Sequence, residues 1–172
     1  MSLPRLTYLG IAIGAGIWCV LLALPAVLAH LSGSPEGAPE LVASLFRPIC
    51  HQLEGRSVLL FGHPLAVCSR CSAIYVAFFA GTLFYPLVRS IETPVMPPRW
   101  VFFLAVAPMI LDVLAGIVGL HAVTMTTRLV SGALFGLTAP FIIIPAAIEG
   151  VVQLMSRSNR PTVHQQKGLS DA

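Results

Sequence analysis

The chain has 172 residues, of which 56% are hydrophobic and only 10% are charged, and its formal net charge is +3. Because about a quarter of the residues in soluble domains are charged, this composition excludes an ordinary soluble domain and indicates an integral membrane protein. No basic run with interleaved aromatic residues predicts a nucleic-acid partner, so the expected surroundings are those of the lipid bilayer.

Four apolar stretches are long enough to form membrane-spanning helices, each of which needs roughly 20 residues. They lie at about 8–29, 68–88, 100–120 and 129–154. A chain of this length fits one domain. We therefore predict an all-α, four-helix membrane bundle over residues 1–156, with a long Cys/His-containing loop between its first two helices. The polar tail, 157–172, is expected to be disordered.

Small residues recur at four-residue spacing, at Gly10 and Gly14 and again at Gly132 and Gly136. This spacing lets membrane helices approach closely. Packing within the bundle is the favoured interpretation, and a homo-oligomer interface is the alternative.

The basic residues favour one orientation, because cytoplasmic loops of membrane proteins are enriched in Lys and Arg. With the N-terminus inside, six basic residues are cytoplasmic and four are not. We therefore expect an inner-membrane protein with both termini in the cytoplasm and with the loop 30–67 outside. The inner set is Arg5, Arg89, Arg99, Arg157, Arg160 and Lys167, and the outer set is Arg47, Arg56, Arg70 and Arg128.

Three of the four cysteines lie between residues 50 and 75, in CHQLEGRSVLLFGHPLAVCSRCSAIY. Cys68 and Cys71 form a C-x-x-C at the start of the second predicted helix, where residues three apart share a face. The positive end of the helix dipole and Arg70 both favour the thiolate form, which binds metals and attacks disulfides. Cys19, inside the first helix, is interpreted as a small buried hydrophobe.

Three cysteines and one histidine are a common closed ligand set for zinc. Cys50, Cys68 and Cys71 would supply the sulfurs, and His51 or His63 the nitrogen. A thiolate-rich site also suits copper(I). The sequence thus predicts a zinc- or copper-type site with a structural or metal-handling role.

Two other interpretations of the same cysteines remain open. One is thiol–disulfide exchange through Cys68 and Cys71 with Cys50 as a third partner, linked to a quinone. The other is a static clasp, in which a disulfide or a zinc only ties the loop to the helix. Arg56 and Arg70 would bind an anion or a quinone carbonyl beside the thiols, or else would contact lipid phosphates.

Asp112 lies inside the third predicted helix, where an ionisable side chain is costly and indicates function. Arg128 opens the fourth helix from the same side of the membrane. We predict that the two form a buried charge pair, which either moves protons or ions or only holds two helices together.

The combination of motifs resembles one family. It comprises C-H-Q at 50–52, Arg56-Ser57, C-x-R-C at 68–71, Pro108 with Asp112, and T-R-L at 127–129 followed by Ser131-Gly132 and Gly136. A family of small multi-pass bacterial and archaeal membrane proteins, known only as a domain of unknown function, has this pattern over roughly 48–136. The resemblance implies one site that includes the cysteines, Asp112 and Arg128, and it assigns no reaction. Ala73 stands where that family usually has glycine.

The architecture is also similar to that of the quinone-reducing disulfide-bond oxidoreductases, which have four helices and a C-x-x-C at the outer start of the second helix. Arg70 or Arg56 would then stand in for the arginine that contacts the quinone. Those enzymes carry a second cysteine pair in their second outer loop, and this chain has none there. An accessory subunit of a larger membrane complex is the third class of function that we retain.

Overall fold

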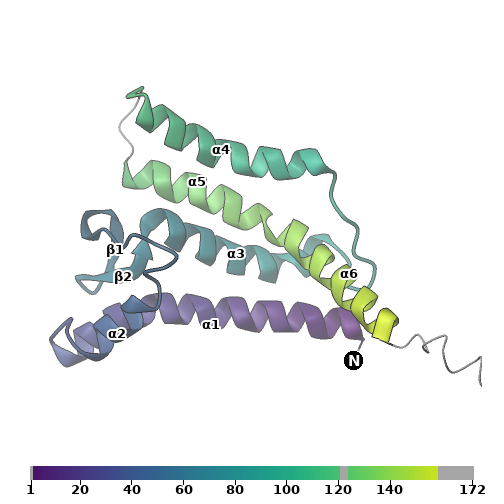
Figure 1. The fold of residues 1–172 in the computed structure, drawn as a ribbon, viewed down its shortest axis with the longest axis horizontal. Helices are drawn as coiled ribbons and strands as arrows, with labels where there is room; N and C mark the ends of the chain where they lie inside the picture. Colours follow the sequence, from purple (N-terminus) through teal and green to yellow (C-terminus); the bar gives the residue numbers. More distant parts are fainter. Residues whose placement is uncertain (1, 121–123, 159–172) are drawn as a thin grey trace, which may run out of the picture.

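The computed structural model describes residues 2–120 and 124–158, and in this part the chain is helical apart from one small hairpin (Figure 1). Four helical segments are long and apolar enough to cross a membrane. This confirms the predicted all-α membrane bundle. The elements are α1 (Leu3–Ser32), α2 (Ala38–Ser44), the 3-10 turn η1 (Glu54–Arg56), β1 (Ser57–Leu60), β2 (His63–Cys68), α3 (Ser69–Val88), α4 (Arg99–Ile117), α5 (Met125–Thr138) and α6 (Pro140–Ser158).

The long helices lie side by side in the order α1, α3, α5, α4, and α6 continues from α5 toward the N-terminal end of α1 (Figure 1). The start of α1 and the end of α6 lie at one end of the bundle. The loop between α1 and α3, which contains α2 and the hairpin, lies at the other end. The cysteine-bearing loop is therefore opposite the N-terminus.

Glycines allow α3 and α5 to pack backbone against backbone. A Cβ atom added at Gly132 would lie 2.6 Å from the carbonyl oxygen of Arg70, and one added at Gly136 would be closer still to that of Ile74. This confirms packing within the bundle as the role of the second glycine pair. At Gly10 and Gly14, an added Cβ would meet nothing within 4 Å.

The fourth predicted span is broken into two helices. Sequence analysis gives one helix over 129–154, whereas α5 ends at Thr138 and α6 begins at Pro140. Proline has no N–H group and its ring collides with the preceding turn, so it starts a new helix rather than continuing an old one. Pro140 is buried, and the change of direction brings α6 onto α1 and α3.

The apolar stretch that precedes α3 forms a β-hairpin, which the sequence analysis did not predict. Strands β1 and β2 are antiparallel, with Leu60 opposite His63 and Ser57 opposite Cys68. Phe61 and Gly62 form the two-residue turn, and both have positive φ (54° and 83°). Such a turn matches the twist of the flanking strands. The hairpin leads directly into α3, so its pairing fixes the start of that helix.

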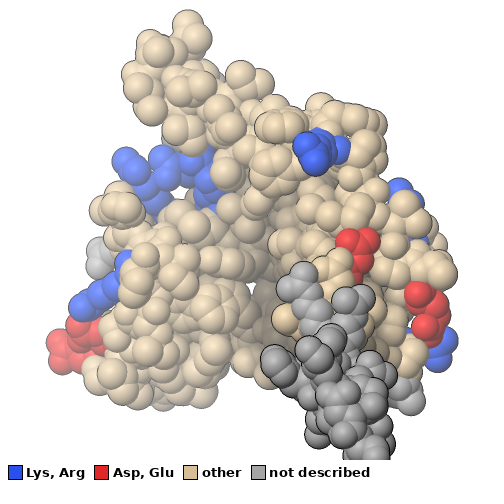
Figure 2. Space-filling view, turned by 45° about the vertical axis from the view of Figure 1, so that its right-hand side comes forward, with Lys and Arg blue, Asp and Glu red and all other residues tan. Residues whose placement is uncertain are grey.

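The surface between the two ends is almost free of charge. Figure 2 shows a mostly tan surface, with the charged side chains gathered in small groups at the left of the molecule and over its right half. Many large apolar side chains on α1 and α4 are exposed, including Ile13, Val20, Phe103 and Leu111. Such a surface is stable only against an apolar solvent. This is the surface of a multi-pass membrane protein in contact with lipid.

Candidate metal centre

Three elements bring the three cysteines together at the hairpin end of the bundle. Cys50 follows α2, Cys68 is the last residue of β2 and the N-cap of α3, and Cys71 lies in the first turn of α3. Their three sulfur atoms all lie within 4.8 Å of one another. Residues that are eighteen and more positions apart in the sequence thus form one cluster, as their spacing suggested.

The sulfurs are positioned by the backbone as well as by packing. The backbone N–H of Cys68 donates a hydrogen bond to the Cys50 sulfur over 3.2 Å. Hydrogen bonds of this kind stabilise a thiolate or a metal-bound sulfur. None of the four cysteines is in a disulfide. The cluster therefore consists of three thiols, one of which already accepts a backbone hydrogen bond.

An apolar core supports the cluster from below. Buried Leu22, Phe46 and Val67 form one group with Cys50, and Cys68 and Cys71 pack against it. Trp18 makes edge-on contacts with the rings of Phe46 and Tyr75, with centroid distances of 5.2 and 5.9 Å. The aromatic contacts restrain α1, the loop and α3 relative to one another, so they limit movement of the sulfurs.

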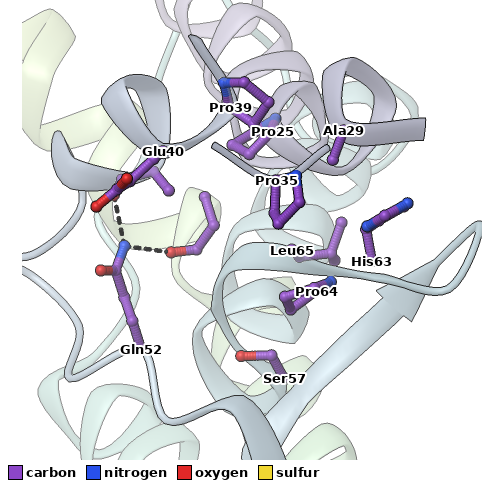
Figure 3. A pocket seen from close by; sticks show the side chains of 12 residues that line it. Pro25, Ala29, Pro35, Pro39, Glu40, Gln52, Ser57, His63, Pro64 and Leu65 are labelled. Carbon is purple, nitrogen blue, oxygen red and sulfur yellow. Dashed lines mark hydrogen bonds between the residues drawn. The ribbon is translucent and has the colours of Figure 1, made fainter. Parts of the chain in front are cut away.

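Gln52 ties the loop to the hairpin. Its side-chain amide donates hydrogen bonds to the carbonyls of Ala43 (2.5 Å) and Ala66 (2.8 Å) (Figure 3). Gln52 has positive φ (49°), a conformation that costs a non-glycine residue roughly 1–2 kcal/mol. These bonds offset that strain and hold the Cys-His dipeptide next to β2. The sequence analysis quoted Gln52 within a motif but gave it no role. Its position beside Cys50 and His51 was the available signal.

The two histidines considered as ligands lie in different places. His51 lines the same pocket as the three cysteines. His63 begins β2, at the opposite end of the strand from Cys68, and lines the neighbouring pocket on the far side from Gln52 (Figure 3). A strand of this length spans roughly 16 Å at about 3.3 Å per residue. His51 therefore shares a pocket with the sulfurs and His63 does not, but the group of ligand atoms within 4.8 Å of one another contains only the three cysteines.

The pocket over the cysteines has a volume of about 360 Å³. Three arginines from three elements line it together with the sulfurs: Arg56 from η1, Arg70 from α3 and Arg128 from α5. Figure 2 shows basic side chains gathered around a hollow on the left of the molecule. The anion-binding arginines predicted from the sequence and the cysteines thus share one pocket.

Arg70 connects this pocket to α4. Its guanidinium donates a hydrogen bond to the carboxylate of Asp112, and the two form an ion pair. The side chain of Asp112 is only 8% exposed. The sequence analysis predicted Arg128 as the partner of Asp112. Arg128 lies in the pocket with Arg70, and its own pairing with Asp112 stays a prediction.

The cluster also affects the acidity of its thiols. The pKa of Cys68 is lowered to about 5. The largest cause is a hydrogen bond from the Cys71 thiol, which stabilises the Cys68 thiolate more than burial disfavours it. The position of Cys68 at the N-terminus of α3 acts in the same direction, because the helix dipole favours negative charge there. At neutral pH, the metal-free site therefore holds one thiolate that is ready to bind a cation.

Cys19 is separate from this cluster. It lies within α1, and its thiol donates a weak hydrogen bond to the backbone carbonyl of Tyr75 over 3.5 Å. Sequence analysis interpreted Cys19 as a small buried hydrophobe, and the structure shows it only partly buried. It also provides an internal control for experiments on the other three cysteines.

Comparison with known proteins places these residues in a family. A protein of Methanocaldococcus jannaschii, itself described as uncharacterised, is 33% identical over 106 residues, which cover 62% of this chain and 68% of that protein. No solved structure matches. A family model described as "Predicted membrane protein (DUF2085)" matches residues 50–142. That match begins at the first cysteine of the cluster and includes Asp112 and all three pocket arginines. Because it covers more than half of the chain, the chain belongs to this family of membrane proteins, as its motifs indicated.

Proposed function

We propose that this protein is a membrane metal-binding protein whose centre is formed by Cys50, Cys68 and Cys71, with His51 as the fourth ligand. The observation that carries this proposal is the grouping of three sulfurs within 4.8 Å. The ion would be zinc or copper(I), the metals that sulfur-rich sites prefer. The role would be structural or metal-handling.

The spacing of the sulfurs fits such an ion. With Zn–S bonds of about 2.3 Å, two sulfurs of a tetrahedral site lie roughly 3.8 Å apart. The three sulfurs need to contract by 1 Å or less from their greatest possible separation of 4.8 Å. Rotation of the cysteine side chains is enough for this movement. The hydrogen bond from the Cys68 N–H to the Cys50 sulfur would remain as an outer contact of the centre.

The openness of the site favours metal handling over a purely structural clasp. Four protein ligands can close a zinc site whether its role is structural or not, but an ion that is passed on must also be reachable from outside the protein. Here the three cysteines and His51 all line the same pocket, and His51 is exposed. An ion at this position would be reachable from the membrane surface.

Metal content and free thiols, measured on one anaerobically purified sample, test the proposal. We expect one equivalent of zinc or copper in the wild-type protein and in Cys19→Ser. We expect its loss in Cys50→Ser and in the double variant Cys68→Ser/Cys71→Ser. A protein without metal, or metal that persists in these cluster variants, would contradict the proposal.

Thiol–disulfide exchange is the second candidate function, and the pKa of about 5 at Cys68 favours it. Oxidation of the Cys68 thiolate and the Cys71 thiol to a disulfide releases two electrons and one proton; a quinone would accept these and take a second proton from water to become a quinol. Two thiols that are missing until a reductant is added, in a metal-free sample, would support this function over the first.

We further propose that the protein lies in the cell's inner membrane, with both termini in the cytoplasm and the metal centre outside. The even number of spans and the position of both helical ends opposite the cysteines support termini on one side of the membrane and cysteines on the other, and the excess of basic residues on the side of the termini supports the cytoplasm as that side. A membrane-impermeant maleimide should label Ser34→Cys, in the cysteine-bearing loop, in intact cells. Thr93→Cys, in the loop between α3 and α4, should react only after lysis. Both variants are made in a background in which the native cysteines are replaced, and reversed labelling would refute the orientation.

An accessory role in a larger membrane complex, or in a homo-oligomer, is supported by how few residues of α4 are buried. This helix packs mainly on α5, and its buried residues are Ala105 and Asp112. Co-purification of a stoichiometric partner in a mild detergent would favour a complex, and a defined multiple of the chain mass would favour a homo-oligomer.

A further inference from the structure

We propose that the pocket over the cysteines is a binding site for a phosphate-like oxyanion, held by Arg56 and Arg128 and bordered by Arg70. The ligand is either a soluble oxyanion or the phosphate of a phospholipid headgroup, because the chemistry that recognises them is the same. This site has its own residues and does not require the metal.

The charges of the pocket carry the proposal. Three guanidinium groups line a single volume of about 360 Å³. Asp112 forms an ion pair with Arg70 and so neutralises one of the three positive charges. Arginine is suited to oxyanions because its planar fork of N–H groups matches two oxygens at once. The Cys68 thiolate in the same pocket offsets a second positive charge, so one positive charge remains, and an anion would balance it.

The positions of the arginines on three separate elements indicate a built site rather than an incidental one. Arg56 comes from the turn before the hairpin, Arg70 from the first turn of α3, and Arg128 from the first turn of α5. Two of them lie at helix N-termini, where the backbone also favours negative charge. Arg70 has its orientation fixed by Asp112 on α4. The pocket is thus walled by positive groups from different directions.

The size and place of the pocket suit this ligand. Its volume corresponds to roughly a dozen water molecules at about 30 Å³ each, so it admits a hydrated phosphate or a headgroup. It lies at the end of the bundle where the apolar spans begin. Phospholipid phosphates are present at that depth, and soluble anions reach it from the water.

The test measures oxyanion binding in two arms. In the first, protein stripped of lipid in a neutral detergent is titrated with radiolabelled inorganic phosphate. In the second, protein is equilibrated in nanodiscs of phosphatidylcholine containing a fraction of phosphatidylglycerol, and retained phospholipid is counted by native mass spectrometry. Arg56→Gln and Arg128→Gln are compared with Arg47→Gln, which removes an exposed arginine at the same end of the molecule, outside this pocket.

We expect each pocket variant to weaken binding about tenfold or more, since a hydrogen bond to a charged group has about this effect, and we expect Arg47→Gln to leave it unchanged. Phosphate binding in the first arm identifies a soluble oxyanion, and retention in the second arm alone identifies a lipid headgroup. Binding in neither arm, or equal effects of all three variants, would overturn the proposal.

Both arms are run on zinc-loaded and on metal-free protein. Oxyanion binding without metal would establish this site even if the metal centre failed. Metal binding without any oxyanion binding would refute only the inference drawn here.

Discussion

Gly132→Ala is the sharpest test of the packing that builds the site. The added methyl group would lie 2.6 Å from the carbonyl oxygen of Arg70 and 3.2 Å from the Cβ of Ala73. Ordinary van der Waals contact begins at 3.4 Å. Because the nearest atom belongs to the backbone of α3, no side chain can rotate away. Helix α5 must withdraw from α3 until the 2.6 Å separation reaches at least 3.4 Å.

Overpacking of this kind costs roughly 1–3 kcal/mol. The replacement of glycine by alanine also stabilises a helix by up to about 1 kcal/mol, because alanine has the higher helix propensity. Gly150→Ala is the matched control, because it makes the same exchange within α6 where an added Cβ meets nothing within 4 Å. The difference between the two variants therefore isolates the steric cost.

At about 2–4 °C per kcal/mol for a chain of this size, Gly132→Ala should unfold roughly 2–12 °C below Gly150→Ala. Thermal unfolding in detergent, followed by tryptophan fluorescence, measures the gap. The same withdrawal would move Arg128 of α5 away from Arg70, so oxyanion binding should also weaken in Gly132→Ala. Equal unfolding temperatures for the two variants would refute the close approach of α3 and α5.

Three further outcomes follow from the site. Asp112→Asn should destabilise the protein by roughly 3–5 kcal/mol, because it leaves the half-buried Arg70 without its carboxylate partner. The control Glu92→Gln, which removes an exposed carboxylate, should cost less than about 1 kcal/mol. Thermal unfolding measures both variants. His51→Ala should lower zinc affinity about tenfold or more and His63→Ala should not, in a competition titration with a chelator. In metal-free protein, the rate of alkylation of Cys68 should be nearly constant between about pH 6 and 8, because the pKa of Cys68 is about 5 and the thiol is already ionised in this range. An ordinary thiol, by contrast, titrates near pH 8.5. The stability gained from this lowered pKa is present above the unfolded value and is lost as pH falls toward 5. A rate that rises about tenfold per pH unit, measured by mass spectrometry, would show an unperturbed thiol.

Much of the architecture could be predicted because membrane spans are set by composition. A bilayer requires long apolar helices, and hydropathy alone finds them. The sequence also groups Cys50 with Cys68 and Cys71, because all three lie in one loop or at the start of the helix that follows it. By contrast, the hairpin at 57–68 was missed. Its strands are largely apolar, so they show no clear alternation of polar and apolar residues, and the Phe61-Gly62 turn lacks the usual Asn or Asp.

Side-chain partners were harder to predict than helices. Asp112 and Arg70 are forty-two positions apart, and only the packing of α4 on α5 brings them into contact. Sequence analysis paired Asp112 with Arg128, because both were expected at the same depth in adjacent helices; that pair stays a prediction, and the contact that sequence analysis missed is the one with Arg70. Depth limits the choice of partner but does not determine it, since several arginines meet at one end of the bundle. The choice between His51 and His63 likewise depends on the hairpin, which carries His63 away from the sulfurs.

The first turn of α3 explains why this region holds the site. Residues at and just before this turn face different neighbours: Cys68 meets Cys50 of the loop, Arg70 meets Asp112 of α4, and Cys71 completes the sulfur cluster. The Arg70 carbonyl also accommodates Gly132 of α5. A cation bound by the sulfurs would therefore fix the one turn on which the loop, α4 and α5 converge. A ligand that binds only the folded state stabilises it in proportion to the logarithm of its concentration. The proposed metal binding, the buried ion pair and helix packing would in this way be parts of one arrangement, and a change at any of them would reach the others through the start of α3.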